Sequence, residues 1–127
     1  MKSSYKIDEE KNVIIAVFTG NHTVEEMINH VNLVNSDPKF RSGMNTIADL
    51  TEASIDWNYT DIDKFRTYCI SIESIRGECK WALVHNDGAS YSTAKIFIMM
   101  CEAWMEKIKS RLFSNMQDAN SWIRKDE

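Results

Sequence analysis

The chain has few of the residues that interrupt a fold or hold it together covalently. It contains 127 residues, with one proline (Pro38) and four glycines, so no linker or low-complexity tract divides it. Its three cysteines lack the short spacing of a metal-binding or redox pair, and we expect them to be small apolar core residues. A chain of this length can bury a core without disulfides or metals. We therefore predict one domain over residues 1–127.

An excess of positive charge and a long apolar run are also missing. The formal net charge is −4 and the isoelectric point is about 5.4, whereas nucleic-acid binders usually concentrate lysine and arginine on one face. The first residues lack the apolar segment of a signal peptide. The longest nearly apolar run, Ile96 to Met105, is interrupted by Glu102 and covers about half of a bilayer. These absences predict a cytoplasmic protein with no transmembrane segment and no nucleic-acid partner.

The apolar patterns alternate between strand and helix periods, in the order ββαβαβαβα. Strands are expected at these ranges: 5–8, 12–19, 44–50, 80–85 and 110–113. Helices are expected from Thr23, from about Thr60 to Gly77, from about Ser92 to Lys107, and from Ser114. Such alternation implies a mainly parallel sheet with its first strand paired antiparallel at an edge. The predicted fold is α/β, with a mixed, mainly parallel five-stranded sheet and about four helices.

Local signals refine these elements. Thr23 with Glu26, and Ser114 with Gln117, have the spacing of capping boxes that open the first and last helices. Residues 13–18 are apolar at every position, as is typical of a strand covered on both faces. The predicted buried side of the second helix consists of Ile62, Phe65, Cys69, Ile72 and Ile75.

Three segments carry a resemblance to a known family. They are Val17-Phe18-Thr19-Gly20 with the capped helix start at residues 23–26; Ala48-Asp49-Leu50; and a C-terminal set of Trp81–Val84, Tyr91, Leu112–Ser114 and Asp118–Ile123. Over about residues 5–124 the chain resembles the SpoIIAA-like family of small bacterial proteins in the STAS superfamily. A more distant likeness is to the CRAL-TRIO lipid carriers. The resemblance rests on pattern and element order, so it implies the fold more directly than the function.

The resemblance implies a regulatory role with one departure. Typical members antagonise anti-sigma factors and are switched by phosphorylation of a serine in an Asp-Ser-Ser-Gly-Leu-type turn after the third strand. Here Asp49, Thr51 and Asp56 echo that pattern. The paired serines and the glycine are absent, and Trp57 and Tyr59 stand nearby. The sequence therefore leaves the phosphoserine switch without support.

Polar residues stand at the ends of several predicted strands and allow two interpretations. Asp49 and Thr51 stand at the end of the third strand, and His85 and Asn86 at the end of the fourth. A histidine beside an aspartate or a hydroxyl can form a base–nucleophile pair at the carboxyl edge of a parallel sheet. The same residues also commonly cap helices and fill turns. No histidine or cysteine spacing matches a zinc site, and neither a dinucleotide fingerprint nor a P-loop occurs, so we expect no metal and no cofactor.

Aromatic residues and the third helix are the remaining candidates for a binding surface. Trp57 and Tyr59 lie in a predicted loop, where aromatics either pack over the sheet or form interaction hot spots. The apolar arc of the third helix is wider than one core contact needs. Its outer side is buried in the core, in a homodimer, or against an apolar ligand. The partner- or ligand-facing candidates are Asp49, Thr51, Asp56, Trp57, Tyr59, His85, Asn86, Tyr91, Phe97, Met100 and Trp104.

These features favour a non-enzymatic binding or regulatory module that acts through contacts with a protein partner, or as a homodimer. The alternative is a carrier or sensor of a small apolar, lipid-like ligand. That alternative predicts an enclosed pocket beside the third helix, near Phe97, Met100 and Trp104. A third hypothesis, an enzyme using the polar strand ends, requires the histidine and its neighbours to converge.

Overall fold

The computed structural model describes residues 2–86 and 89–125, and these residues form a single sheet with helices on both faces. The elements are β1 (Ser3–Asp8), β2 (Val13–Asn21), α1 (Val24–Asn35), β3 (Asn45–Ser54), α2 (Tyr59–Ser71), α3 (Glu73–Arg76), β4 (Cys79–Val84), α4 (Ala89–Trp104), β5 (Ile108–Phe113) and α5 (Met116–Arg124). The strand order is β1-β2-β3-β4-β5, with β1 antiparallel to β2 and the other neighbours parallel. The predicted mixed, mainly parallel sheet is confirmed.

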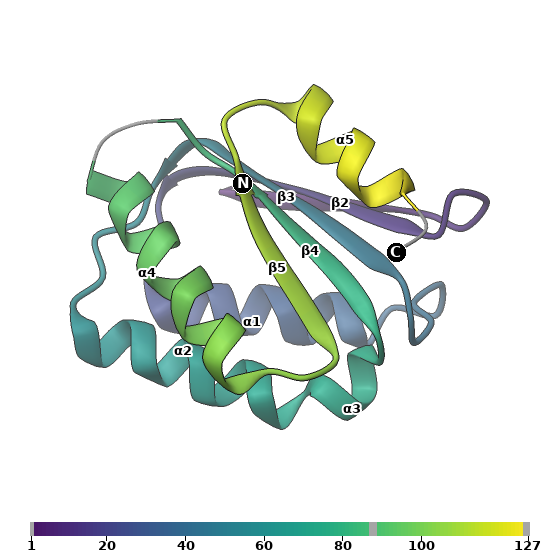
Figure 1. Cartoon of the computed structure of the whole chain (residues 1–127), viewed down its shortest axis with the longest axis horizontal. Coiled ribbons are helices and arrows are strands. Elements are labelled where there is room, and N and C mark those ends of the chain that lie inside the picture. The colour runs from purple at the N-terminus through teal and green to yellow at the C-terminus, as the bar shows by residue number, and fades with distance from the viewer. Residues whose placement is uncertain (1, 87–88, 126–127) are drawn as a thin grey trace.

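The helices divide unequally between the two faces of the sheet. Figure 1 shows α1, α2 and α4 on one face and α5 on the other. The larger core cluster lies between the sheet and α1, α2 and α4. A smaller one lies between the sheet and α5. Because α5 contacts β3, β4 and β5, it leaves part of β2 uncovered, and Val17 is 37% exposed. The prediction that β2 is covered along both faces is therefore wrong at this end of the strand.

Two helix starts show how local caps set the element bounds. Thr23 forms the predicted capping box, since its side chain accepts from the Glu26 N–H while Glu26 accepts from the Thr23 N–H. At α5 the cap lies one residue later than predicted. Asn115 has extended backbone and its Oδ1 accepts from the Asp118 N–H at 2.8 Å. Asparagine is at least as good an N-cap as serine, so the assignment of the cap to Ser114 is wrong.

The second predicted helix is interrupted at Ile72, which separates α2 from α3. The interruption moves the buried side of the last turn by one position. Ile75 is 48% exposed, contrary to the prediction, and Arg76 is buried in its place, with 2% of its surface exposed. The predicted apolar face therefore ends in a buried guanidinium.

β3 extends four residues beyond its predicted end. A register shift between Val17 and Thr19 lets pairing continue until Asn21 lies opposite Ser54. β3 carries one more residue than β2 across the shift, as in a β-bulge. Thr51 consequently lies inside β3 rather than in the predicted turn after it, and that part of the prediction is wrong, whereas Asp49 lies within the strand as predicted.

Lys80 attaches α5 to the sheet. Its side chain is buried, and Nζ donates to the Trp122 carbonyl at 2.9 Å and the Lys125 carbonyl at 2.6 Å. These carbonyls belong to the end of α5, where unpaired acceptors and the negative end of the helix dipole favour a cation. The ammonium group also lies 5.3 Å from the centre of the Trp122 ring.

The substitution Lys80→Met is expected to lower the free energy of unfolding by about 1 to 3 kcal/mol, because it removes hydrogen bonds from a charged donor while keeping most of the apolar stem. Urea denaturation followed by circular dichroism measures this change. Lys109→Met, at an exposed position on β5, is the matched control. Equal stability of the two variants would show that Lys80 does not hold α5 in place.

Candidate functional site

A cavity of about 80 Å³ lies between the sheet and the helices α1, α2 and α4. The sheet provides the inward side chains of its central strands, among them Ile14, Ala16, Phe18, Leu50 and Leu83. The helices provide Met27, Val31, Val34, Phe65, Ala94 and Phe97. Alternate residues of a strand face the same side, so the nearly continuous apolar runs of β2 and β4 give this side a carbon surface. Nearly all of the exposed wall atoms are carbon.

The volume of the cavity decides what it can hold. One water molecule needs about 10–15 Å³ of cavity volume, so the cavity accommodates about five to eight water-sized groups. A wall of carbon offers water few hydrogen-bond partners, and apolar cavities of this kind remain dry. An empty cavity of this size costs about 2 kcal/mol of stability at ~24 cal/mol per Å³. Filling it with apolar atoms is therefore favourable.

Arg76 is a charged side chain in the cavity wall. Its Nε donates to Asn35 Oδ1 at 2.7 Å and its Nη1 donates to Thr46 Oγ1 at 2.9 Å. The guanidinium carbon lies 5.2 Å from the ring centre of Phe40 and 5.4 Å from that of Trp81. Burial lowers the pKa of Arg76 from its usual value, but a guanidinium stays charged in proteins. Within residues 2–86 and 89–125, no carboxylate forms an ion pair with it.

His30 lies in the same wall, on α1. Its ring packs edge-on against Phe18, with centres 4.6 Å apart, and against Tyr5 at 5.9 Å. Burial lowers its pKa to about 4, with smaller contributions from the positive charge of Arg76 and from His22. His30 is therefore neutral at physiological pH, as an apolar wall requires.

The structure separates the two aromatic residues predicted from the loop after β3. Trp57 is half-buried and lines the cavity. Its Nε1 donates to the His22 carbonyl at 2.9 Å, and its ring lies edge-on to Phe65 with centres 5.4 Å apart. Tyr59 is 70% exposed. Trp57 is therefore part of the cavity wall, and Tyr59 is a surface residue.

In the described residues, no hydrogen bond joins the polar candidates at the end of β3 to those at the end of β4. Thr51 donates from both its N–H and its Oγ1 to Asp49 Oδ1, at 3.1 and 2.7 Å, which makes a local turn-like contact within β3. His85 is buried, and in the described part of the chain neither of its ring nitrogens has a hydrogen-bond partner. Asp56 and Asn86 are exposed. The sequence also predicts a turn at residues 86–88 after β4, and Asp87 and Gly88 in it lie outside the described residues.

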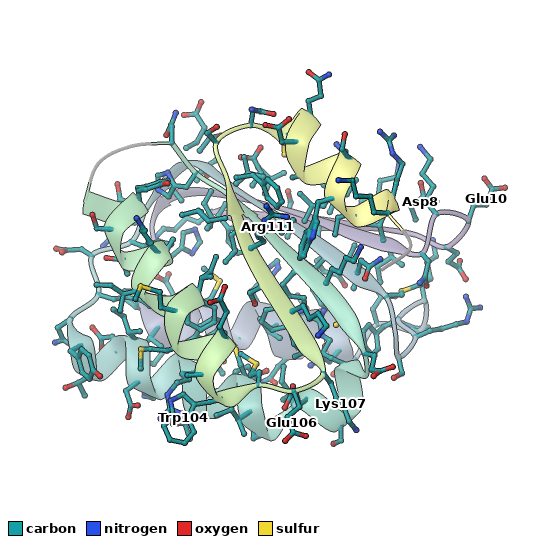
Figure 2. All side chains as sticks on the ribbon, viewed as in Figure 1. Asp8, Glu10, Trp104, Glu106, Lys107 and Arg111 are labelled. Atoms are coloured by element: carbon teal, nitrogen blue, oxygen red, sulfur yellow. The ribbon has the colours of Figure 1, made fainter. Side chains whose placement is uncertain are left out.

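The candidates on α4 have three different environments. Phe97 lines the cavity and packs against Phe65 with ring centres 5.2 Å apart. Met100 and Tyr91 are half-buried, and Met100 packs against the larger core cluster. Trp104 is 65% exposed, and Figure 2 shows it pointing away from the sheet. The pocket predicted beside this helix therefore exists at Phe97 and does not extend to Trp104.

Two wall residues, His30 and Arg76, were not predicted as site residues. Both stand where a helical apolar face continues, His30 three positions after Met27 and Arg76 four positions after Ile72. That spacing was the available signal, because a polar residue at a core position of a helix is unusual. The pattern could not show that the two side chains meet the same cavity.

Other kinds of site find no support in the described parts of the chain. They contain no group of three or more histidine, cysteine or acidic side chains placed to hold a metal ion. Cys69, Cys79 and Cys101 are free and buried, as predicted for core residues. Burial raises the pKa of Cys79 to about 11 and that of Cys101 to about 12, so both remain thiols at neutral pH. No described helix has the length and apolar character needed to cross a membrane.

The chain has the SpoIIAA-like fold, within the α/β class. It is similar to the crystal structure of an uncharacterized protein of the DUF3478 family with a SpoIIAA-like fold from Shewanella loihica PV-4. The two chains are 12% identical, with a TM-score of 0.61 over 95% of this chain and 93% of that one. At this identity the likeness establishes the fold and leaves the activity open. No protein-family model and no curated protein matches the sequence.

Removing the side chain of Trp57 is expected to destabilise the protein, since it deletes a hydrogen bond and a ring contact in the cavity wall. Trp57→Ala should lower the free energy of unfolding by about 2 to 3 kcal/mol. Tyr59→Ala, two residues away at an exposed position, should change it by less than about 0.5 kcal/mol. Chemical denaturation measures both. Similar effects for the two variants would contradict this placement.

His30 is expected to make the stability depend on pH. Its folded pKa of about 4 lies below the usual 6.5, so between these values the unfolded state binds more protons. Stability therefore falls as pH falls from about 6.5 towards 4, by at most about 1.4 kcal/mol per pH unit. Urea denaturation at pH 7, 6 and 5 should give a smaller slope for His30→Gln than for the wild type. Equal slopes would show that His30 is protonated readily in the folded state.

Proposed function

We propose that the protein is a non-enzymatic cytoplasmic carrier or sensor of a small apolar ligand, bound between the sheet and α4. The observation that supports this is the carbon-lined cavity of about 80 Å³. Apolar atoms that fill such a space gain dispersion contacts and break no hydrogen bonds of the wall. The buried, free cysteines fit a reducing compartment. Of the alternatives raised by the sequence, the ligand carrier is thus favoured over the protein-binding module.

The position of α4 suggests how a bound ligand could be sensed. Ala94 and Phe97 contribute to the cavity wall from the inner side of this helix. On its outer side Ile96, Met99 and Trp104 are exposed. A ligand that moves the inner side of α4 would move this outer surface with it. Sensing needs such differential contact with two states of the protein.

A protein partner is the second candidate function. The observation that favours it is the same exposed outer surface of α4, since large apolar and aromatic residues are enriched at protein interfaces. Trp104 is held beneath Arg66, whose guanidinium carbon lies 5.4 Å from the ring centre. A second copy of the chain or another protein could bind there. Analytical ultracentrifugation of the wild type and of Trp104→Ala tests for the homodimer.

Binding in the cavity is tested with toluene and the substitution Ala94→Leu. Toluene should raise the melting temperature of the wild-type protein in a concentration-dependent way, because a ligand that binds the folded state stabilises it by mass action. The larger side chain of the variant would add carbon atoms to the cavity wall, so the affinity should fall about tenfold or more. Two-dimensional NMR titration, following the signals of Phe97 and its neighbours, measures the dissociation constants.

Ala103→Leu is the matched control, since Ala103 is exposed on the same helix. It should bind toluene like the wild type. Absence of toluene binding to the wild type would overturn the proposed function, as would binding that Ala94→Leu leaves unchanged. Native mass spectrometry of protein purified from cells then identifies the ligand that is bound in vivo.

A further inference from the structure

Arg76 introduces a positive charge into a cavity wall that is otherwise almost wholly apolar. It is 2% exposed, and its hydrogen-bond partners, Asn35 and Thr46, are both neutral. A buried charge is costly unless a charge of the opposite sign lies close to it. In the described residues, no aspartate or glutamate forms an ion pair with this guanidinium. The balancing charge is therefore missing from the described part of the protein around the cavity.

A structural role accounts for part of this arrangement. Asn35 is the last residue of α1, and Arg76 itself ends α3, so the negative ends of two helix dipoles lie near the guanidinium. Its contacts with Phe40 and Trp81 add cation–π attraction. A guanidinium has five N–H donors, and the hydrogen bonds to Asn35 and Thr46 use two of them. Donors remain for a further acceptor.

A second polar side chain stands in the same wall. His30 is more than nine-tenths buried and lines the cavity. It makes ring contacts with Tyr5 and Phe18 but no hydrogen bond within the described residues. A neutral imidazole always carries one N–H donor. Arg76 and His30 are therefore two donor groups of the wall, and Arg76 carries the charge, although their nitrogen atoms add little to its accessible surface.

We propose that the ligand is a short aliphatic carboxylic acid, bound as its anion with the carboxylate directed to Arg76 and the hydrocarbon chain directed to Phe97 and Trp57. This inference rests on the proposed function, because it specifies what the cavity binds. Arg76 is attached to Asn35 at the end of α1, whereas Trp57 is attached to His22 just before its start. The guanidinium and the Trp57 ring thus lie towards opposite ends of α1.

The dimensions fit a chain of about six carbon atoms. The lining residues of α1 extend from Met27 to Val34, a rise of about 10 Å. In the empty cavity nearly all of the accessible wall is carbon, so the nitrogen atoms of Arg76 and His30 contribute little to it. The carboxylate therefore gains its hydrogen bonds by displacing wall side chains at that end, and the hydrocarbon chain fills the space that already exists.

The test compares hexanoate with hexanamide, which has the same shape but no charge. At pH 7.5 the wild-type protein should bind hexanoate about ten- to a hundredfold more tightly than hexanamide, since a charge-assisted hydrogen bond is the stronger kind. Arg76→Met should remove this preference while its affinity for hexanamide stays within about threefold of the wild type. Isothermal titration calorimetry and NMR titration measure both ligands.

The controls separate this inference from the proposed function. Arg41→Met removes a positive charge from the exposed surface and should keep the preference for hexanoate. If Arg76→Met fails to fold, Arg76→Lys and the wild-type comparison of the two ligands still decide the matter. Equal wild-type affinity for acid and amide would overturn the role of Arg76 and leave the apolar cavity function intact. No binding of either ligand, or of toluene, would overturn both.

Discussion

The side chain of Arg76 connects the elements that surround the cavity at the end where the parallel strands begin. Its hydrogen bonds reach α1 through Asn35 and β3 through Thr46, and its face lies against Trp81 of β4. The backbone carbonyl of Arg76 also accepts a hydrogen bond from the N–H of Gly43, just before β3, at 2.7 Å. These contacts join α1, β3 and β4 beside the cavity, whose wall includes Arg76 itself. The cavity, its charge and its proposed ligand all depend on this arrangement.

The order of the elements could be predicted because it depends on local signals. The Thr23 capping box, the apolar period of α1 and the β1–β2 hairpin each involve residues close together in the chain. The extent of β3 could not be predicted, since its last residues are strand only because a register shift lets them pair with β2. The break at Ile72 was missed for a related reason. Its effect is to bury Arg76 against α1 and β3, which lie far away in sequence.

The candidate site was predictable only in part. Trp57 was predicted as an aromatic residue in a loop and Phe97 as part of the wide apolar arc of the third helix, and both line the cavity. His30 and Arg76 were not recognised, because a search for apolar periodicity passes over polar residues on an apolar face. The cavity itself has no sequence signature. It is the volume left between α1, α2, α4 and the sheet, and that volume depends on how all four pack.

The strand order of the sheet follows the order of the chain. Each parallel strand therefore joins an edge that its predecessor has already formed, and the sheet can assemble in the order in which a ribosome releases it. The cavity is completed late in this sequence, because Ala94 and Phe97 of α4 close a space whose other walls come from earlier residues. A nascent chain would thus expose the inner surface of β2 and β3 until α4 emerges. During that interval the ligand site is an open apolar groove, and a ligand present during synthesis could enter it without any later opening of the fold.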